Sequence, residues 1–154
     1  MASRLALPFS AAQSTAPRPI IIDTDPGIDD SVALLLALAS PELEVRGITV
    51  VAGNAPLETT VHNALQVVSL AARTDVPVFA GCARPLVREP IRGKFSGIDG
   101  LGGVKLASPA ATPAAEHAVD FLIRSLSVAA EKGEKLTLCM LAPMTNLAVA
   151  LRLR

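Results

Sequence analysis

Short apolar runs alternate with longer helical patterns along most of the chain. Isoleucines at positions 20–22, bounded by proline and aspartate, predict a short strand buried on both faces, because β-branched side chains fit a covered pleated sheet. Pro26 and Gly27 then turn the chain. The stretch 31–39 is apolar almost all round, so it predicts a helix that is packed on both sides.

The same alternation continues to the end of the sequence. Further strands are predicted at 43–51, 76–81 and 136–141, and further helices at about 56–73, 113–131 and 146–154. Thr145 is expected to cap the last helix, and prolines and glycines make 82–113 irregular. Strands that alternate with helices imply right-handed parallel crossovers. The predicted fold class is therefore α/β, with a three-layer, open, mainly parallel (Rossmann-like) sheet.

Composition and charge restrict the partners of this chain. The 154 residues suffice for one domain, with 51% hydrophobic residues, four Phe and no Trp or Tyr. Fourteen basic residues balance fourteen acidic ones without a basic run, so nucleic acid and anionic membranes are not expected partners. No apolar run reaches the ~18 to 20 residues that cross a bilayer. Cys82 and Cys139 lack metal-type spacing and predict reduced thiols in a cytoplasmic protein.

The domain is expected to occupy residues 19–154. Residues 1–18 contain a brief apolar piece interrupted by proline, which is too short for the core of a secretory signal. They are therefore interpreted as a disordered N-terminal tail.

Four carboxylates follow the first predicted strand within eight residues: Asp23, Asp25, Asp29 and Asp30. One or two of them could simply cap the free N–H groups at the start of the helix. However, two carboxylates about 4 Å apart repel by roughly 4 kcal/mol at an effective dielectric constant near 20, which favours a cation among them. Oxygen ligands without Cys or His suit Ca²⁺ or Mg²⁺, and open α/β sheets bind ligands at the carboxyl ends of their strands.

The motif DTDPGIDD after an apolar strand resembles the N-terminal motif of the inosine-uridine-preferring nucleoside hydrolases, which are Ca²⁺-dependent N-ribohydrolases. The resemblance runs from about Ile20 to the end but covers only the N-terminal half of such a protein, so the chain is expected to be truncated. Haloacid-dehalogenase-like phosphatases also begin with an apolar strand and Asp-x-Asp. They usually continue with Gly-Thr, whereas Pro26 and Gly27 followed by x-Asp-Asp fit the hydrolases.

The resemblance implies a role for each matching residue. Asp25 corresponds to a calcium ligand that is also the general base for the attacking water, and Asp30 corresponds to a second calcium ligand. Asp29 and Asn54 correspond to residues that contact the ribose. The segment LCMLAPMTN resembles the family segment in which a main-chain carbonyl binds calcium, here that of Leu141. The implied substrate is a ribonucleoside and the implied cofactor is Ca²⁺. The full-length form is expected to be a homo-oligomer.

Two departures from the family pattern change these expectations. Ser96 stands where many pyrimidine-active members have a histidine near the leaving base, so we expect purine or broad nucleoside activity rather than a preference for uridine. The family's fourth calcium ligand, its adjacent histidine and a further ribose segment belong to the C-terminal half. His62 and His117 are interpreted as ordinary helix residues rather than replacements.

Three functions therefore remain open. The first is Ca²⁺-dependent hydrolysis of the N-glycosidic bond of ribonucleosides to free base and ribose. The second is a truncated, non-catalytic remnant that binds an ion or ribose weakly. The third is a Mg²⁺-dependent phosphatase that uses Asp23 or Asp25 as its nucleophile.

Overall fold

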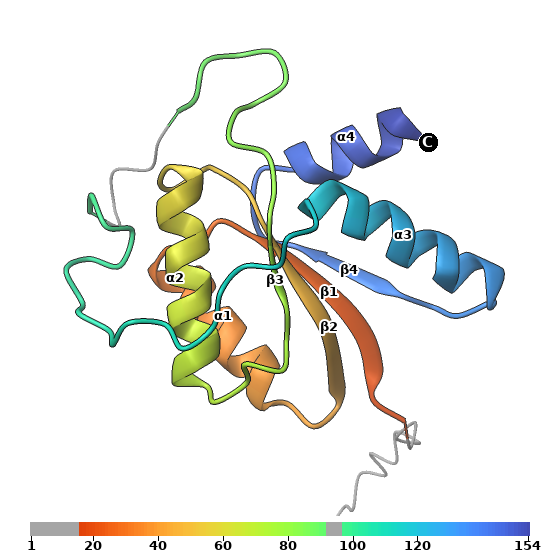
Figure 1. The fold of residues 1–154 in the computed structure, drawn as a ribbon, viewed down its shortest axis with the longest axis horizontal. Helices are drawn as coiled ribbons and strands as arrows, with labels where there is room; N and C mark the ends of the chain where they lie inside the picture. Colours follow the sequence, from red (N-terminus) through yellow and green to blue (C-terminus); the bar gives the residue numbers. More distant parts are fainter. Residues whose placement is uncertain (1–15, 92–96) are drawn as a thin grey trace, which may run out of the picture.

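Four parallel strands form one sheet with the order β3-β2-β1-β4 (Figure 1). The computed structural model describes residues 16–91 and 97–154, and most of the predicted 1–18 tail lies outside them. The elements are β1 (Arg18–Thr24), α1 (Ile28–Ala39), β2 (Leu43–Val50), α2 (Leu57–Leu70), β3 (Val78–Ala80), α3 (Ala118–Glu131), β4 (Thr137–Met140) and α4 (Thr145–Leu153). The predicted α/β class with a parallel sheet is confirmed.

The helices cover the two faces of the sheet in pairs, as Figure 1 shows. Alternate residues of β1 point to opposite faces, as the pleat requires. Ile20 and Ile22 belong to the core beneath α1 and α2, whereas Ile21 belongs to the core beneath α3 and α4. All three isoleucines are buried. The predicted three-layer arrangement is therefore confirmed.

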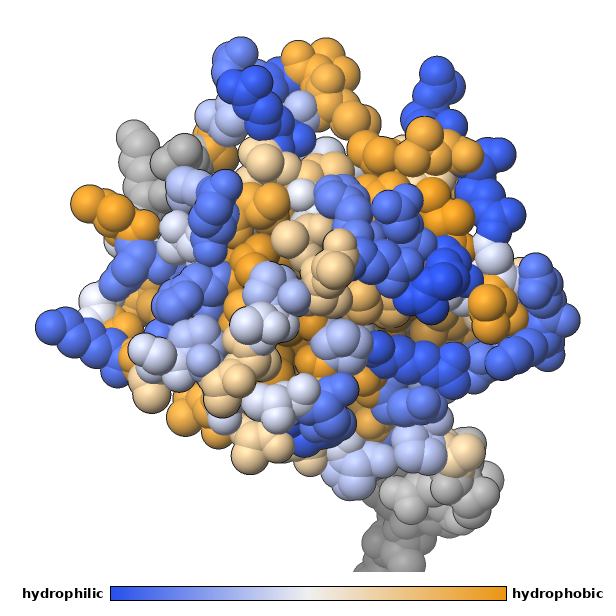
Figure 2. All heavy atoms as spheres, in the orientation of Figure 1, coloured by the Kyte–Doolittle hydropathy of each residue, from blue (hydrophilic) through white to orange (hydrophobic). Residues whose placement is uncertain are grey.

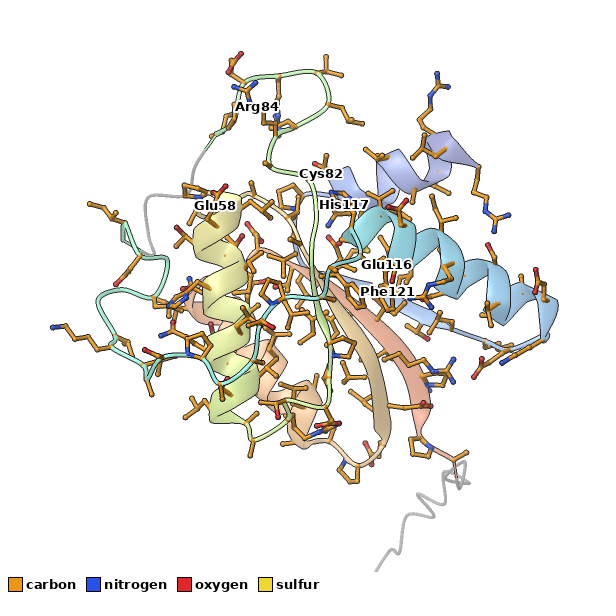
Figure 3. All side chains as sticks on the ribbon, in the orientation of Figure 1. Glu58, Cys82, Arg84, Glu116, His117 and Phe121 are labelled. Atoms are coloured by element: carbon orange, nitrogen blue, oxygen red, sulfur yellow. The ribbon has the colours of Figure 1, made fainter. Side chains whose placement is uncertain are left out.

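The core beneath α3 contains a close aromatic pair. The rings of Phe79 and Phe121 are stacked with their centroids 3.9 Å apart. Gly47 of β2 lies against them, and a Cβ there would come within 2.7 Å of Phe121. Phe121 lies on the face of α3 that meets the sheet (Figure 3). With so few aromatic residues in the chain, this pair belongs to packing and leaves neither ring for a ligand.

The starts of α1, α3 and α4 differ from the sequence predictions. Helix α1 begins at Ile28, three residues earlier than predicted, and α4 begins at Thr145 after Met144 in the N-cap position. Thr145 was therefore wrongly predicted as the cap, and Met144 makes no side-chain cap hydrogen bond. Helix α3 begins at Ala118, because His117 occupies the N-cap and its Nδ1 accepts a hydrogen bond from the Val119 N–H.

The prediction that α1 is packed on both sides was also wrong. Val32 and Leu36 are 63% and 70% exposed, because α1 packs only toward the sheet and α2. Apolar side chains are also exposed on the segment 84–91 and on α4, as Figure 2 shows. No helix within the described residues is both long and apolar enough to span a membrane.

Candidate functional site

The carboxyl ends of three strands meet at the predicted acidic cluster. The Leu141 N–H, just after β4, donates to the main-chain oxygen of Asp23 at 2.8 Å. The Val51 N–H, just after β2, donates to the main-chain oxygen of Thr24 at 3.1 Å. Strand β1 lies between β2 and β4, so the residues that follow it have a neighbour on each side. This arrangement is the crevice in which open α/β sheets bind their ligands.

Asp25 is the most enclosed of the predicted site residues, with only 5% of its surface exposed. Its Oδ2 accepts a hydrogen bond from the Asn54 N–H at 2.6 Å, and its main-chain oxygen accepts one from Asn54 Nδ2 at 3.1 Å. Burial raises the pKa of Asp25 to about 6; the Asn54 N–H opposes this shift, and the charges of Asp30 and Asp29 add to it. A carboxylate with this pKa is mostly ionised at neutral pH and is poised to accept a proton.

Asp30 is buried and holds the turn before α1 together. Its Oδ1 accepts a hydrogen bond from Thr24 Oγ1 at 2.8 Å, and its Oδ2 accepts hydrogen bonds from the Gly27 N–H and from Asn54 Nδ2, both at 3.2 Å. Part of its role is therefore the structural capping that the sequence also allowed. Each carboxylate oxygen has two lone-pair sites, so these bonds leave capacity for a cation.

The other predicted site residues differ in how many of their polar atoms are already hydrogen-bonded. Asp29 is exposed in the first turn of α1, and its side chain makes no hydrogen bond to another described residue. Asn54 has both its main-chain N–H and its Nδ2 occupied by Asp25 and Asp30, so a ribose hydroxyl would have to donate to its Oδ1. The main-chain oxygen of Leu141 accepts no hydrogen bond within the described part of the chain.

Sequence reasoning missed a buried polar network beneath these residues. Asp23 is fully buried, and its Oδ2 accepts hydrogen bonds from Thr49 Oγ1 at 2.7 Å and from Asn146 Nδ2 at 2.8 Å. Its Oδ1 has no hydrogen-bond partner among the described residues. Burial raises the pKa of Asp23, although both hydrogen bonds lower it. Asn146 ends the segment that carries Leu141, and this was the one signal in the sequence that pointed to it.

The donor set fits a cation that prefers oxygen ligands. The set that the family resemblance implies is two carboxylates and a main-chain oxygen. No cluster of three or more His, Cys, Asp or Glu side chains suited to a metal occurs within residues 16–91 and 97–154. None of the ion pairs within these residues involves Asp25 or Asp30. Burial and, to a smaller extent, the charge of Asp30 raise the pKa of Asp25, and a bound cation would oppose both effects. Ca²⁺ takes six to eight oxygens, so three protein groups supply only part of its shell.

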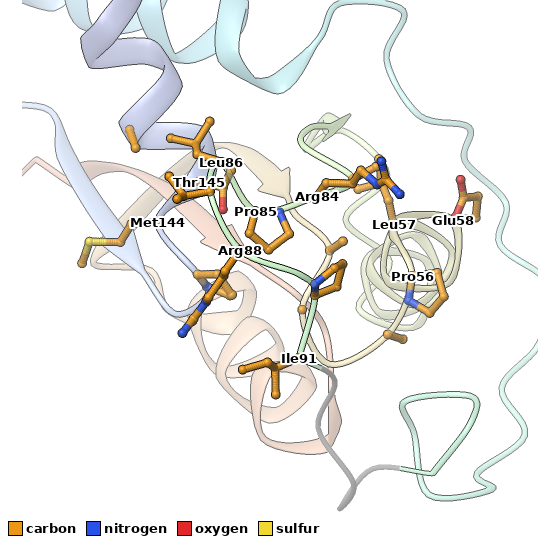
Figure 4. Close-up of a pocket in the computed structure, with 18 residues that line it drawn as sticks. Pro56, Leu57, Glu58, Arg84, Pro85, Leu86, Arg88, Ile91, Met144 and Thr145 are labelled. Carbon is orange, nitrogen blue, oxygen red and sulfur yellow. The ribbon is translucent and has the colours of Figure 1, made fainter.

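A cavity of about 770 Å³ opens beside this cluster. Figure 4 shows its lining from the start of α2, the segment 83–91 and the start of α4. Gly53 and Pro143 line the cavity, and a Cβ on Gly53 would clash with Oδ2 of Asp25. None of the five predicted site residues is among the residues that line it, and its volume lies within the range of about 300 to 1,000 Å³ that is typical of small-molecule pockets.

The histidines and cysteines take no part in the cluster. His62 is exposed on α2, and His117 lies at the start of α3 (Figure 3). Cys82 and Cys139 are free thiols. Burial and the charge of Asp23 raise the pKa of Cys82, so it remains a thiol at neutral pH. Ser96 lies outside the described residues.

Residues 20–154 match the family model described as inosine-uridine preferring nucleoside hydrolase. The chain is 49% identical over 133 residues to an uncharacterized protein of Schizosaccharomyces pombe, covering 86% of this chain and 42% of that protein. It is 47% identical over 135 residues to a protein of Photobacterium profundum named pyrimidine-specific ribonucleoside hydrolase RihA, covering 87% of this chain and 43% of that protein.

Solved structures agree with the sequence relatives. A purine-preferring ribonucleoside hydrolase from Gardnerella vaginalis superposes with a TM-score of 0.79 at 34% identity, over 88% of this chain and 43% of that one. A plant nucleoside hydrolase superposes with a TM-score of 0.76 at 38% identity, over 90% and 44% of the two chains. The chain therefore spans less than half the length of these relatives.

Proposed function

Because the chain belongs to the inosine-uridine preferring nucleoside hydrolase family, we propose that its acidic cluster is part of a calcium-dependent site that hydrolyses ribonucleosides to free base and ribose. Family membership supports hydrolysis of ribonucleosides over the phosphatase alternative, in which Asp23 or Asp25 would be the nucleophile. The observation that carries the proposal is the buried carboxylate of Asp25, with a pKa of about 6, beside the buried carboxylate of Asp30.

Asp25 is the proposed general base. Its Oδ1 accepts no hydrogen bond from another described residue, whereas its Oδ2 is held by the Asn54 N–H. Asp25 can therefore keep its orientation through one oxygen and take a proton from water with the other. Asp29, which is exposed, and Oδ1 of Asn54 are free to accept hydrogen bonds from ribose hydroxyls. The sugar would thus be fixed while the bond to the base breaks.

Asp25, Asp30 and the main-chain oxygen of Leu141 are the groups that would hold the calcium ion. When bound, the ion supplies positive charge that lowers the pKa of neighbouring water. The carboxylates then stabilise the positive charge that develops on the sugar as the C–N bond lengthens. The cavity beside Gly53 and Pro143 provides the room for the nucleoside.

A second candidate function is a binding remnant without turnover. The observation that favours it is the incomplete donor set, since two carboxylates and one main-chain oxygen supply only part of the six to eight oxygens that calcium takes. Both functions predict calcium binding, and only hydrolysis separates them.

Calorimetry on Asp30→Asn tests the shared site, because the substitution keeps the size of the side chain and removes its charge. We expect calcium affinity to fall by about tenfold or more, as at other ligand-shell substitutions. Asp75→Asn is the control, since the Asp75 side chain is exposed and pairs only with Arg73, beyond the C-terminal end of α2 and away from the cluster. Affinity of Asp30→Asn equal to that of the unmodified chain contradicts the assignment. Release of base from inosine or uridine, measured with calcium and with a chelator, then decides between enzyme and remnant.

A further inference from the structure

One buried amide joins the ends of three neighbouring segments. Asn146 lies in the first turn of α4 and is fully buried. Its Nδ2 donates to Oδ2 of Asp23 at 2.8 Å and to the main-chain oxygen of Val50 at 3.2 Å. Its Oδ1 accepts a hydrogen bond from the Cys82 N–H at 2.8 Å. The side chain thus links α4 to the carboxyl ends of β1 and β2 and to the segment that follows β3.

The surroundings leave no space for another side chain. A Cβ on Gly81 would clash with Oδ1 of Asn146, so the chain after β3 approaches the amide as closely as backbone allows. An aspartate at position 146 would lack both donor hydrogens and add a second negative charge beside Asp23. The position therefore requires a neutral group that donates twice and accepts once, which an asparagine provides.

This linkage lies directly beneath the proposed site. The Leu141 N–H donates to the main-chain oxygen of Asp23, the same residue whose carboxylate accepts from Asn146. Pro143, between Leu141 and α4, lies against Gly53, which in turn lies against Asp25. The turn that carries the Leu141 carbonyl is therefore held at one end by β4 and at the other by Asn146.

We propose that Asn146 is a positioning residue, which fixes the Leu141 carbonyl relative to Asp25 by joining α4 to the ends of β1, β2 and β3. It touches neither substrate nor ion, and it acts through Asp23 and the turn 141–145. Only the calcium measurement described below rests on the proposed function. The structural readout is independent of calcium.

The structural readout is amide hydrogen exchange at Leu141 and Cys82 in the metal-free 154-residue chain. Asn146→Ala removes the hydrogen bond to Cys82 and frees the turn, so exchange at both amides should accelerate by about tenfold or more. Gln66→Ala is the matched control, because Gln66 is a buried amide that donates to two main-chain oxygens, those of Leu106 and Ala107, away from the cluster. It should lower the melting temperature without selective exchange at Leu141. Equal acceleration in both variants overturns the proposal.

The functional readout is calcium affinity by calorimetry. Asn146→Ala should weaken binding by about tenfold, the usual effect of disturbing groups that orient ligands, whereas Gln66→Ala should leave it unchanged. Wild-type affinity in Asn146→Ala overturns the positioning role. Absence of binding to the unmodified chain refutes the proposed calcium site instead, and the exchange data still decide the role of Asn146. If the alanine variant does not fold, Asn146→Ser, which has a hydroxyl that can hydrogen-bond, replaces it. If neither variant folds, Asn146 is required for the fold itself, and this outcome overturns a specific positioning role.

Discussion

Replacing Asp25 by asparagine should change the stability of the metal-free chain in a pH-dependent way. The pKa of Asp25 is raised from 3.8 to about 6, mainly by burial, so the folded state binds this proton more tightly than the unfolded state. The stabilisation is present below the unfolded pKa and is lost as pH rises from about 4 through about 6. Two pKa units correspond to about 3 kcal/mol. The substituted asparagine has no such proton, but its amide oxygen can still accept a hydrogen bond from Asn54.

The free energy of unfolding of Asp25→Asn, minus that of the unmodified chain, should therefore increase by about 3 kcal/mol between about pH 4 and about pH 7. Urea unfolding followed by circular dichroism, with a chelator present, measures this difference. Asp29→Asn is the control, because Asp29 is exposed and contributes only a minor part of the shift at Asp25. Its difference should stay within about 0.5 kcal/mol, the usual range for surface substitutions.

Adding calcium at neutral pH should stabilise the unmodified chain more than Asp25→Asn. An ion that binds only the folded state at about 100 times its dissociation constant stabilises it by about 2.7 kcal/mol, and this gain requires the Asp25 carboxylate. Parallel pH profiles of the two proteins in chelator would refute the reasoning about burial. An equal calcium effect on both would refute the role of Asp25 as a ligand.

Three further predictions concern the cavity and the exposed surface. Gly53→Ala should displace the Asp25 carboxylate, because the added Cβ clashes with Oδ2; we expect about 1 to 3 kcal/mol of destabilisation and weaker calcium binding, and unchanged calorimetry would contradict this. Ser96 predicts that inosine is hydrolysed better than uridine, and steady-state rates decide, with a strong uridine preference as the opposing result. The 154-residue chain alone should be poorly stable and nearly inactive, since Val32 and Leu36 are exposed. A monomer with cooperative thermal unfolding and full turnover would show this to be wrong.

The order of strands and helices followed from the sequence because each element has its own periodicity. The sequence did not predict which face of α1 meets solvent, because an almost entirely apolar segment has no polar stripe to mark that face. Val32 and Leu36 were therefore wrongly expected to be covered. The N-cap at Met144 was missed for a related reason: local residue preference pointed to Thr145, whereas the turn is set by contacts with other strands.

Part of the site was equally accessible to sequence reasoning. Parallel strands end at one edge of a sheet, so Asp25, Asp30 and Asn54 were expected to meet, and they do. The sequence could not show that the Nδ2 group of Asn54 is already occupied. It also gave no role to Asn146, because that role depends on bonds to residues far away along the chain.

The strand order has a consequence for the speed at which this site forms. Strands β2 and β3 are added in sequence order on one side of β1, but β4 pairs on its other side. Asn146 contacts Asp23 across 123 positions of the chain. Contacts this distant in sequence carry a large loop-closure entropy and slow folding. We expect the half of the site on β1 and β2 to assemble early, while a ribosome could still be making the rest. The Leu141 carbonyl arrives last, so ion binding should report the final step of folding.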